Sequence, residues 1–214
     1  RLEKLPDLTF DAAKPTHKLH VVIAQKESSE TVHLFLKLRS LVGEAELTVD
    51  GESAKPELEK SYGDAFDHAW QRLTIFRKLD LASNQALLTQ LQDPDPQARS
   101  FILGRLSDRK AKEAVPTLLE MLKTTESVEQ QLRLVGALAA VGDPKAVQPL
   151  IDLTSRRDPH FVVQIIFALA QIADPTAEGY LVTLAGGHPV EAIQSAAKQA
   201  LLELHRRKAN DSSM

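Results

Sequence analysis

The sequence of 214 residues contains no cysteine, which excludes disulfides and cysteine-ligated metal sites. It also lacks an excess of positive charge: 26 Lys and Arg face 29 Asp and Glu, so the basic surface typical of a nucleic-acid-binding protein is missing. No apolar run approaches the roughly 20 residues that a membrane-spanning helix needs. The hydrophobic content of 43% is ordinary for a globular protein, so the chain can form one domain of good size or two small ones.

Two of these features bear on the cellular compartment. A chain without thiols suits an oxidising compartment, although cysteine can also be missing by chance. The first residue is Arg1 and not Met, which indicates that a signal peptide, a membrane anchor or another segment precedes it. Together they favour a periplasmic or membrane-anchored protein over a cytoplasmic one.

Sequence motifs of common catalytic sites are missing as well. There is no Gly-x-Ser-x-Gly, no phosphate-binding loop and no Gly-rich dinucleotide motif. Asp64 and His68 are four residues apart on an expected helix and could offer two metal ligands, but a solvated helix face is the stronger interpretation. We therefore expect no catalytic residue, no metal and no cofactor.

A repeat of about 31 residues organises the C-terminal part of the chain. Asp143-Pro144 and Asp174-Pro175 are 31 residues apart, and the apolar residues around them coincide, Leu138 with Leu169 and Leu150 with Leu181. Each unit holds two segments with the i, i+3, i+4, i+7 apolar spacing of a helix that buries one face. A period of this length indicates stacked helical hairpins.

The Asp-Pro steps mark helix starts inside each unit. Proline is tolerated in the first turn of a helix but not in its interior, and the Asp before it can cap the free backbone N–H groups. A second set of helix breaks, at 92–96, 157–159 and 186–189, separates one unit from the next. Two breaks per repeat predict one helical hairpin per repeat and about four hairpins in all.

The units "DPDPQARSFILGRL", "ALAAVGDPKAVQPLIDL" and "ALAQIADPTAEGYLVTL" resemble HEAT repeats, specifically the short bacterial type also found in phycobilin-lyase subunits. The resemblance covers about residues 80–207 and implies an α-solenoid. Gln131 and Val162 stand where the family often has the arginine seen at Arg99, which argues against a continuous Asp/Arg ladder.

Residues before the repeats change period. Segments 16–25, 31–40 and 44–51 predict three antiparallel strands, with Leu34 and Leu36 inward. The expected fold is therefore mainly α, an α-solenoid preceded by a small antiparallel β-sheet. Residues 1–55 form an extended arm and the sheet, residues 56–208 form the solenoid with 56–79 as its capping helix and a packing partner of the sheet, and residues 209–214 form a disordered tail. In β-strand 31–40 we expect three residues at an exposed sheet edge: Phe35, Lys37 and Arg39.

By the HEAT resemblance, the second helix of each hairpin lines a concave groove. Positions that the repeat does not need for its core would be exposed in this groove, and Asp108 is the one carboxylate among them. The candidate groove residues are Phe101, Gly104, Arg133, Gly136, Gln164, Phe167 and Gln171. The alternative is that Phe101 and Phe167 are buried in the core and that the register is shifted by one residue.

These features predict a non-catalytic protein-interaction scaffold. Its groove would hold a protein partner, as a component of a larger complex, and the sheet would provide a second docking or assembly surface. The alternative is a lyase-like or chaperone subunit that binds a tetrapyrrole or another small ligand together with a partner subunit, as the phycobilin-lyase resemblance implies. Nucleic acid is not an expected partner, because net positive charge is missing.

Overall fold

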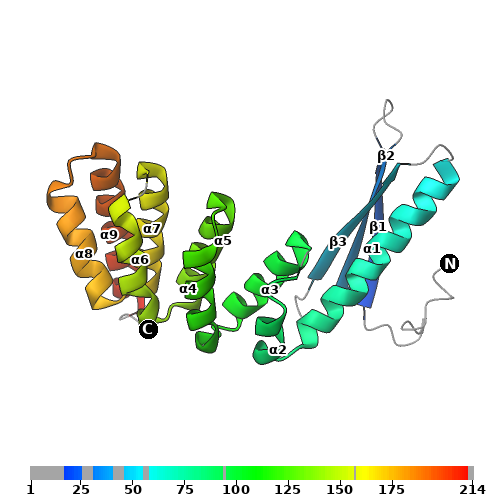
Figure 1. Cartoon of the computed structure of the whole chain (residues 1–214), viewed down its shortest axis with the longest axis horizontal. Helices are drawn as coiled ribbons and strands as arrows, with labels where there is room; N and C mark the ends of the chain where they lie inside the picture. Colours follow the sequence, from blue (N-terminus) through cyan, green and yellow to red (C-terminus); the bar gives the residue numbers. More distant parts are fainter. Residues whose placement is uncertain are drawn as a thin grey trace. The chain divides into compact units, whose positions relative to one another are not determined.

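The chain divides into two compact units, residues Arg1–Leu81 and residues Ala82–Met214, and each is described by itself (Figure 1). The arm expected at residues 1–15 lies outside the described residues, as do the last three residues. The computed structural model describes residues 17–25, 31–40, 46–54, 58–93, 95–156 and 158–211.

The first unit contains the three expected antiparallel strands, β1 (His17–Gln25), β2 (Thr31–Ser40) and β3 (Glu46–Ala54), in the order β1-β2-β3. The alternation in β2 is observed: Leu34 and Leu36 are buried, while Phe35 between them is exposed. Side chains two residues apart in a strand share one face, so this sheet has one apolar face and one face toward solvent.

Helix α1 (Leu58–Leu81) covers the apolar face of the sheet over β3 and β2. Its small residues Ala65 and Ala69 are fully buried and let the helix lie directly on β3. Gly51 makes this approach feasible, because a Cβ atom there would stand 2.1 Å from the carbonyl oxygen of Ala65. The expectation that this helix packs against the sheet therefore agrees with the structure.

The boundary between the units differs from the expected one. We expected residues 56–79 to belong to the solenoid as its cap, with a boundary after residue 55, but the division falls after Leu81. The physical reason is that α1 packs its apolar face against the strands of the first unit. Leu73 and Phe76 belong to this buried face. Ile75 lies off that face and is 48% exposed.

The expected sheet edge is also corrected. Phe35, Lys37 and Arg39 lie on β2, which is the central strand and is hydrogen-bonded to a neighbour on both sides. Their side chains belong to the solvent-facing side of the sheet, where Lys37 forms an ion pair of 2.8 Å with Glu46. A strand paired on both sides has no free backbone groups for another chain.

The second unit consists of four helical hairpins in two layers. In one layer α3, α5, α7 and α9 pack each against the next, and α2, α4, α6 and α8 form the other layer (Figure 1). Helix α9 extends to Asp211, so residues 209–211 of the expected disordered tail are helical. The helices are α2 (Asn84–Thr89), α3 (Pro96–Asp108), α4 (Val115–Thr124), α5 (Val128–Val141), α6 (Val147–Leu153), α7 (Pro159–Ile172), α8 (Pro175–Gly187) and α9 (Glu191–Asp211).

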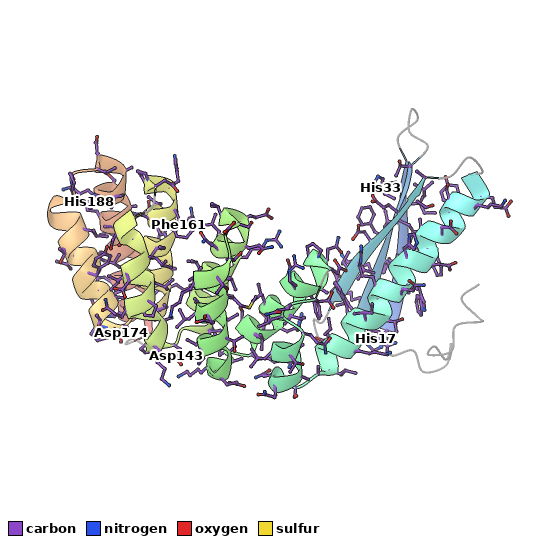
Figure 2. All side chains as sticks on the ribbon, viewed as in Figure 1. His17, His33, Asp143, Phe161, Asp174 and His188 are labelled. Atoms are coloured by element: carbon purple, nitrogen blue, oxygen red, sulfur yellow. The ribbon has the colours of Figure 1, made fainter. Side chains whose placement is uncertain are left out.

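The Asp-Pro steps act as helix starts, as the sequence predicts. Asp174 accepts a hydrogen bond of 2.8 Å from the backbone N–H of Thr176, and Asp143 accepts one of 2.9 Å from Lys145 at the short 3-10 turn before α6. Figure 2 shows Asp143 and Asp174 at one end of the stacked helices and Phe161 at the other. Each carboxylate satisfies a backbone donor that the first helical turn leaves free.

The repeat register is confirmed by burial. The four leucines chosen as equivalent core positions, Leu138, Leu150, Leu169 and Leu181, are all 0% exposed. Apolar side chains from both layers therefore fill one continuous interior between the hairpins.

Candidate functional site

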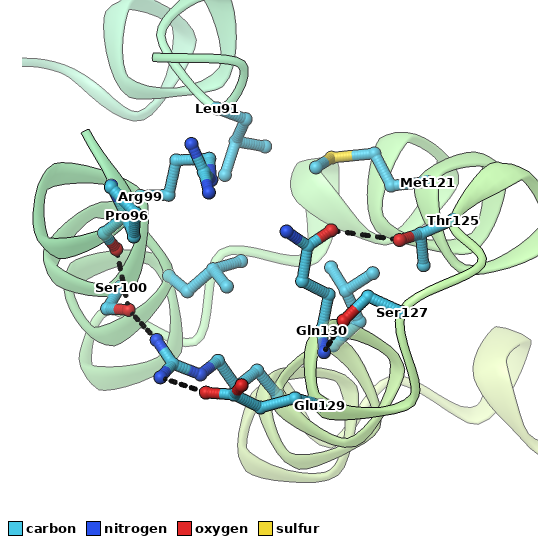
Figure 3. Close-up of a pocket in the computed structure, with 12 residues that line it drawn as sticks. Leu91, Pro96, Arg99, Ser100, Met121, Thr125, Ser127, Glu129 and Gln130 are labelled. Carbon is cyan, nitrogen blue, oxygen red and sulfur yellow. Dashed lines mark hydrogen bonds and ion pairs between the residues drawn. The ribbon is translucent and has the colours of Figure 1, made fainter. Parts of the chain in front are cut away.

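A hollow of about 220 Å³ opens between α3 and the pair formed by α4 and α5 (Figure 3). Its apolar wall comes from side chains that the helical stripes bring to the junction of the first two repeats. The rest of its lining is polar and surrounds that wall. The apolar wall consists of Leu91, Pro96, Leu103, Met121 and Leu134.

Two guanidinium groups stand at this hollow. Arg133 donates to the hydroxyl of Ser100 and forms an ion pair of 2.7 Å with Glu129. Arg99 donates to the backbone carbonyl of Asp93 at 2.5 Å. Both arginines line the hollow, and Glu129 is the one carboxylate among its lining residues. The site therefore carries a small positive excess beside an apolar wall.

A second hollow, of about 360 Å³, continues the first along the groove between α3 and α5. The two share Ser100, Leu103 and Arg133. Gly104 and Gly136 line the second hollow, and a Cβ atom at either glycine would meet nothing within 4 Å. These glycines are therefore not needed for close packing, and their missing side chains leave the groove open. We call the two hollows together the α3/α5 groove.

The candidate residues predicted from sequence fall into two groups. The structure brings Gly104, Arg133 and Gly136 together along the α3/α5 groove. Phe101 lines neither hollow; it is half-buried, and the guanidinium of Arg105 lies 5.1 Å from its ring centroid.

The remaining candidates lie on α7. Gln164 and Gln171 are exposed on its surface, outside both hollows. Phe167 is half-buried and packs against the apolar cluster of the last two repeats. It occupies the repeat position of Gly104 and Gly136, so a ring stands where the first two repeats have no side chain. Asp108 is exposed and pairs with Arg105 on its own helix at 3.8 Å.

Sequence reasoning missed the apolar wall and Arg99. Leu103, Met121 and Leu134 lie on apolar helical stripes, which predict burial in general and give no signal of a hollow beside them. Arg99 was noted only as a repeat position. Its hydrogen bond to Asp93 is matched one repeat later by Gln131, whose amide donates to the carbonyl of Thr125 at 2.7 Å.

The third repeat has no such polar side chain, because Val162 occupies the position and is buried in the apolar cluster. The expected break in the polar ladder thus falls at the third repeat and not at the second. Arginine and glutamine both carry an N–H donor that can bond a loop carbonyl, so the shared contact is kept at this position.

The titratable groups of the α3/α5 groove are few. Among its described lining residues the carboxylate is Glu129, which is held in the ion pair with Arg133, and none of them is a histidine. Within the described residues, no group of three or more His, Asp or Glu side chains is arranged to hold a metal ion. Among the described helices none is both long enough and apolar enough to cross a bilayer.

Comparison with known proteins agrees with this architecture. The family model described as HEAT repeats matches residues 84–165, which extend from the start of α2 into α7. A curated protein named "Bilin biosynthesis protein PecE", from Mastigocladus laminosus, is 33% identical over 109 residues. That match covers 49% of this chain and 38% of the relative, so the chain spans well under half the length of that protein.

The range of the family match coincides with the stacked hairpins. The match begins at the first helix of the first hairpin and includes both Arg99 and Gln131. The fourth hairpin, α8 with α9, follows the matched region and packs on α7 in the same manner. The helical unit of this chain is a solenoid of stacked hairpins, and residues 84–165 of it match the HEAT-repeat model.

Proposed function

We propose that this chain is a non-catalytic protein-interaction scaffold that holds a segment of a protein partner in the α3/α5 groove. The observation that carries the proposal is the continuity of the two hollows through Ser100, Leu103 and Arg133. HEAT repeats commonly offer such surfaces to other proteins, and the matched family supports the same class of function. The sheet of the first unit serves as a second docking or assembly surface.

The lining of the groove sets the chemistry of the partner segment. An apolar side chain of the partner enters the hollow between Leu103, Met121 and Leu134. A neighbouring acidic group meets the guanidinium groups of Arg99 and Arg133, with Arg133 exchanging Glu129 for the partner's carboxylate. Arginine beside an apolar pocket is a common source of binding energy in protein interfaces.

The glycines set where the segment lies. Gly104 and Gly136 let a backbone or side chain of the partner approach α3 and α5 closely. At the third repeat Phe167 fills the equivalent position. We therefore place the segment along the first two repeats, with Phe167 offering its half-exposed ring at the end of the path.

The test is to fill the groove without disturbing the fold. Gly136→Gln places a polar side chain into open space, and it raises helix propensity by up to about 1 kcal/mol, so the protein should melt no earlier than the wild type. Gly179→Gln on α8 is the matched control, since that glycine is also helical, exposed and without a neighbour within 4 Å. Displayed peptides are selected on the wild type and their affinities measured by isothermal titration.

Selected peptides should pair an apolar residue with a nearby Asp or Glu. Gly136→Gln should weaken their binding at least tenfold, equivalent to about 1.4 kcal/mol, while Gly179→Gln leaves it unchanged. Arg133→Ala should weaken acidic peptides and spare peptides whose acid is replaced by an amide. Equal binding to the wild type and Gly136→Gln would place the interaction elsewhere.

A ligand-binding function with a partner subunit is the second candidate, and the similarity to a protein named for bilin biosynthesis favours it. The volume of the groove is compatible with this candidate, because its two joined hollows measure about 220 and 360 Å³, against the roughly 300–1,000 Å³ usual for small-molecule sites. Incubating the protein with a free bilin and recording the visible spectrum tests it. A shifted band that Gly136→Gln abolishes would favour this function over the scaffold.

A further inference from the structure

Strand β1 leaves an apolar surface uncovered. Val21 lies opposite Leu36 and Ile23 opposite Leu34, so the members of each pair share one face of the sheet. The two leucines are no more than 3% exposed, whereas Val21 is 44% and Ile23 is 53% exposed. The apolar face of β1 is therefore about half open at these two positions, although the facing leucines of the adjacent strand are buried.

The position of α1 explains this difference. The helix packs over β3 and β2, and its side chains Arg72 and His68 reach to β3. Phe66 and Trp70 stack on each other with centroids 6.2 Å apart. At 100° per residue they lie on the flank of α1 roughly opposite Arg72 and His68, away from β3. The open apolar side chains of β1 and the stacked rings of α1 thus both lie on the side of this unit away from β3.

The two edge strands of the sheet differ in their contacts with α1. On β3, the carbonyl of Asp50 accepts a hydrogen bond of 2.9 Å from Arg72, and that of Glu52 accepts one of 2.9 Å from the Nδ1–H of His68. These carbonyls are two residues apart, so they point to the same side of the strand. Strand β1 is the last strand on its side of the sheet within the described residues. Side chains of α1 therefore occupy one edge and leave the other for pairing.

We propose that a second copy of this chain pairs with β1 through an antiparallel β1–β1 contact whose two-fold axis passes through Val21. The proposal rests on the assembly role given above to the sheet and names the strand and the partner. In this register all nine residues of β1 find a partner, and Leu19 lies opposite Ile23 on the apolar face. On the apolar face, Val21 then meets its own copy and Ile23 meets Leu19, so both open side chains of that face gain an apolar cross-strand neighbour.

The charges of β1 agree with this self-pairing. Lys18 comes to lie opposite Ala24 and His20 opposite Val22, so no like charges face each other. A two-fold contact is closed, whereas β1 paired with β3 of the next copy would continue without end. Asp50 and Glu52 would attract the basic side chains of β1, but the bonds from α1 already occupy their carbonyls at that edge. The structure therefore favours a dimer over an open filament.

Opposite charges placed at the axis provide the test. Val21→Lys puts two ammonium groups against each other across the axis, and Val21→Glu does the same with carboxylates. Because Val21 is 44% exposed, both variants should keep the fold, which circular dichroism checks. Thr48→Glu, on the solvent-facing side of β3 and opposite Lys37, is the control for an added charge on the same sheet. All are made in the full 214-residue chain.

Light scattering after gel filtration should give twice 23.6 kDa for the wild type and Thr48→Glu, and 23.6 kDa for Val21→Lys and for Val21→Glu alone. An equimolar mixture of the two Val21 variants should return to the dimer mass, because Lys then faces Glu. The fluorescence of Trp70, the one tryptophan of the chain, should differ between dimer and monomer.

Several outcomes would overturn the proposal. A wild type that stays monomeric throughout a concentration series would show that β1 does not pair with a second copy. Species heavier than a dimer would indicate open pairing. Dimers that persist in both Val21 variants would move the contact to another surface. The peptide titrations on Gly136→Gln do not depend on β1, so the groove can fail or hold independently of these results.

Discussion

At the residue scale, single residues end the helices of the repeats. Gly142 ends α5 with φ 73°, in the left-handed region that glycine adopts at no steric cost. One repeat later the same position is Ala173, which ends α7 with φ 59°. Both backbone N–H groups bond to the carbonyl of the core leucine four residues earlier, so the geometry is kept although the side chain differs.

Ala173→Gly should therefore stabilise the protein. A left-handed conformation costs a residue with a Cβ atom roughly 1–2 kcal/mol, and part of this is offset by the greater freedom of glycine in the unfolded chain. We expect a net gain of about 0.5–1 kcal/mol in the free energy of unfolding, measured in urea. Gly142→Ala is the reciprocal control and should lose a similar amount; a gain there would contradict the argument.

At the element scale, polar contacts join helices whose ends would otherwise carry free carbonyls. Arg207 of α9 donates to the carbonyl of Ala170 near the end of α7 at 2.6 Å, and Lys110 after α3 donates to that of Ala140 near the end of α5. Cations at helix C-termini satisfy these carbonyls and oppose the partial negative charge there. Such bonds tie neighbouring repeats together at one end of the stack.

The last hairpin has an ion-pair cluster that makes its stability depend on pH. Lys208, and after it His205, lower the pKa of Glu178 below its ordinary value of 4.5. A lowered folded-state pKa means that the stabilising contribution is present above the unfolded value and disappears as the pH falls through the folded value. Glu178→Gln should therefore reduce stability near pH 7 and make no difference once the pH is well below 4.5.

The measurement is the melting temperature of the wild type and Glu178→Gln at several pH values between 7 and 3. The two curves should converge on acidification and move closer in high salt, because exposed ion pairs are screened. Glu203→Gln, on the same hairpin and exposed, is the matched control. A constant difference at all pH values would mean that the charge of Glu178 does not act on folding.

At the scale of the whole molecule, each repeat of the solenoid contacts its neighbours, and the leucines at equivalent positions connect them. Leu138→Ala should lower the free energy of unfolding by about 2–5 kcal/mol, because it removes a fully buried side chain and leaves a cavity. Leu202→Ala is the same change at a 72%-exposed position and should cost less than about 0.5 kcal/mol. Similar losses in both would contradict the repeat register.

The two proposed binding surfaces lie in different units. The groove that we assign to a protein segment lies wholly within the solenoid, and the pairing strand lies wholly within the first unit. A dimer through β1 would present two α3/α5 grooves in one assembly. Two linked sites can raise the apparent affinity for a bivalent partner without any new contact.

Local sequence determined the elements of this protein. The Asp-Pro steps set helix starts because proline and the capping carboxylate act within one turn, and the 31-residue recurrence of leucines set the core because each repeat buries the same face. The strands followed from alternation in segments such as Val32–Leu38. These effects depend on neighbours a few residues away, so they can be read without coordinates.

Only the tertiary structure decided which elements pack against each other and in what order. The amphipathic pattern of α1 is equally compatible with a helix that caps the solenoid and with one that covers the sheet. In the structure α1 packs on the sheet, where Gly51 allows the close approach. Strand order made β2 central and β1 an edge, which alternation cannot show because it is the same in both positions. The groove arises where Gly104 and Gly136 meet across two helices, and an open space between helices has no pattern within either one.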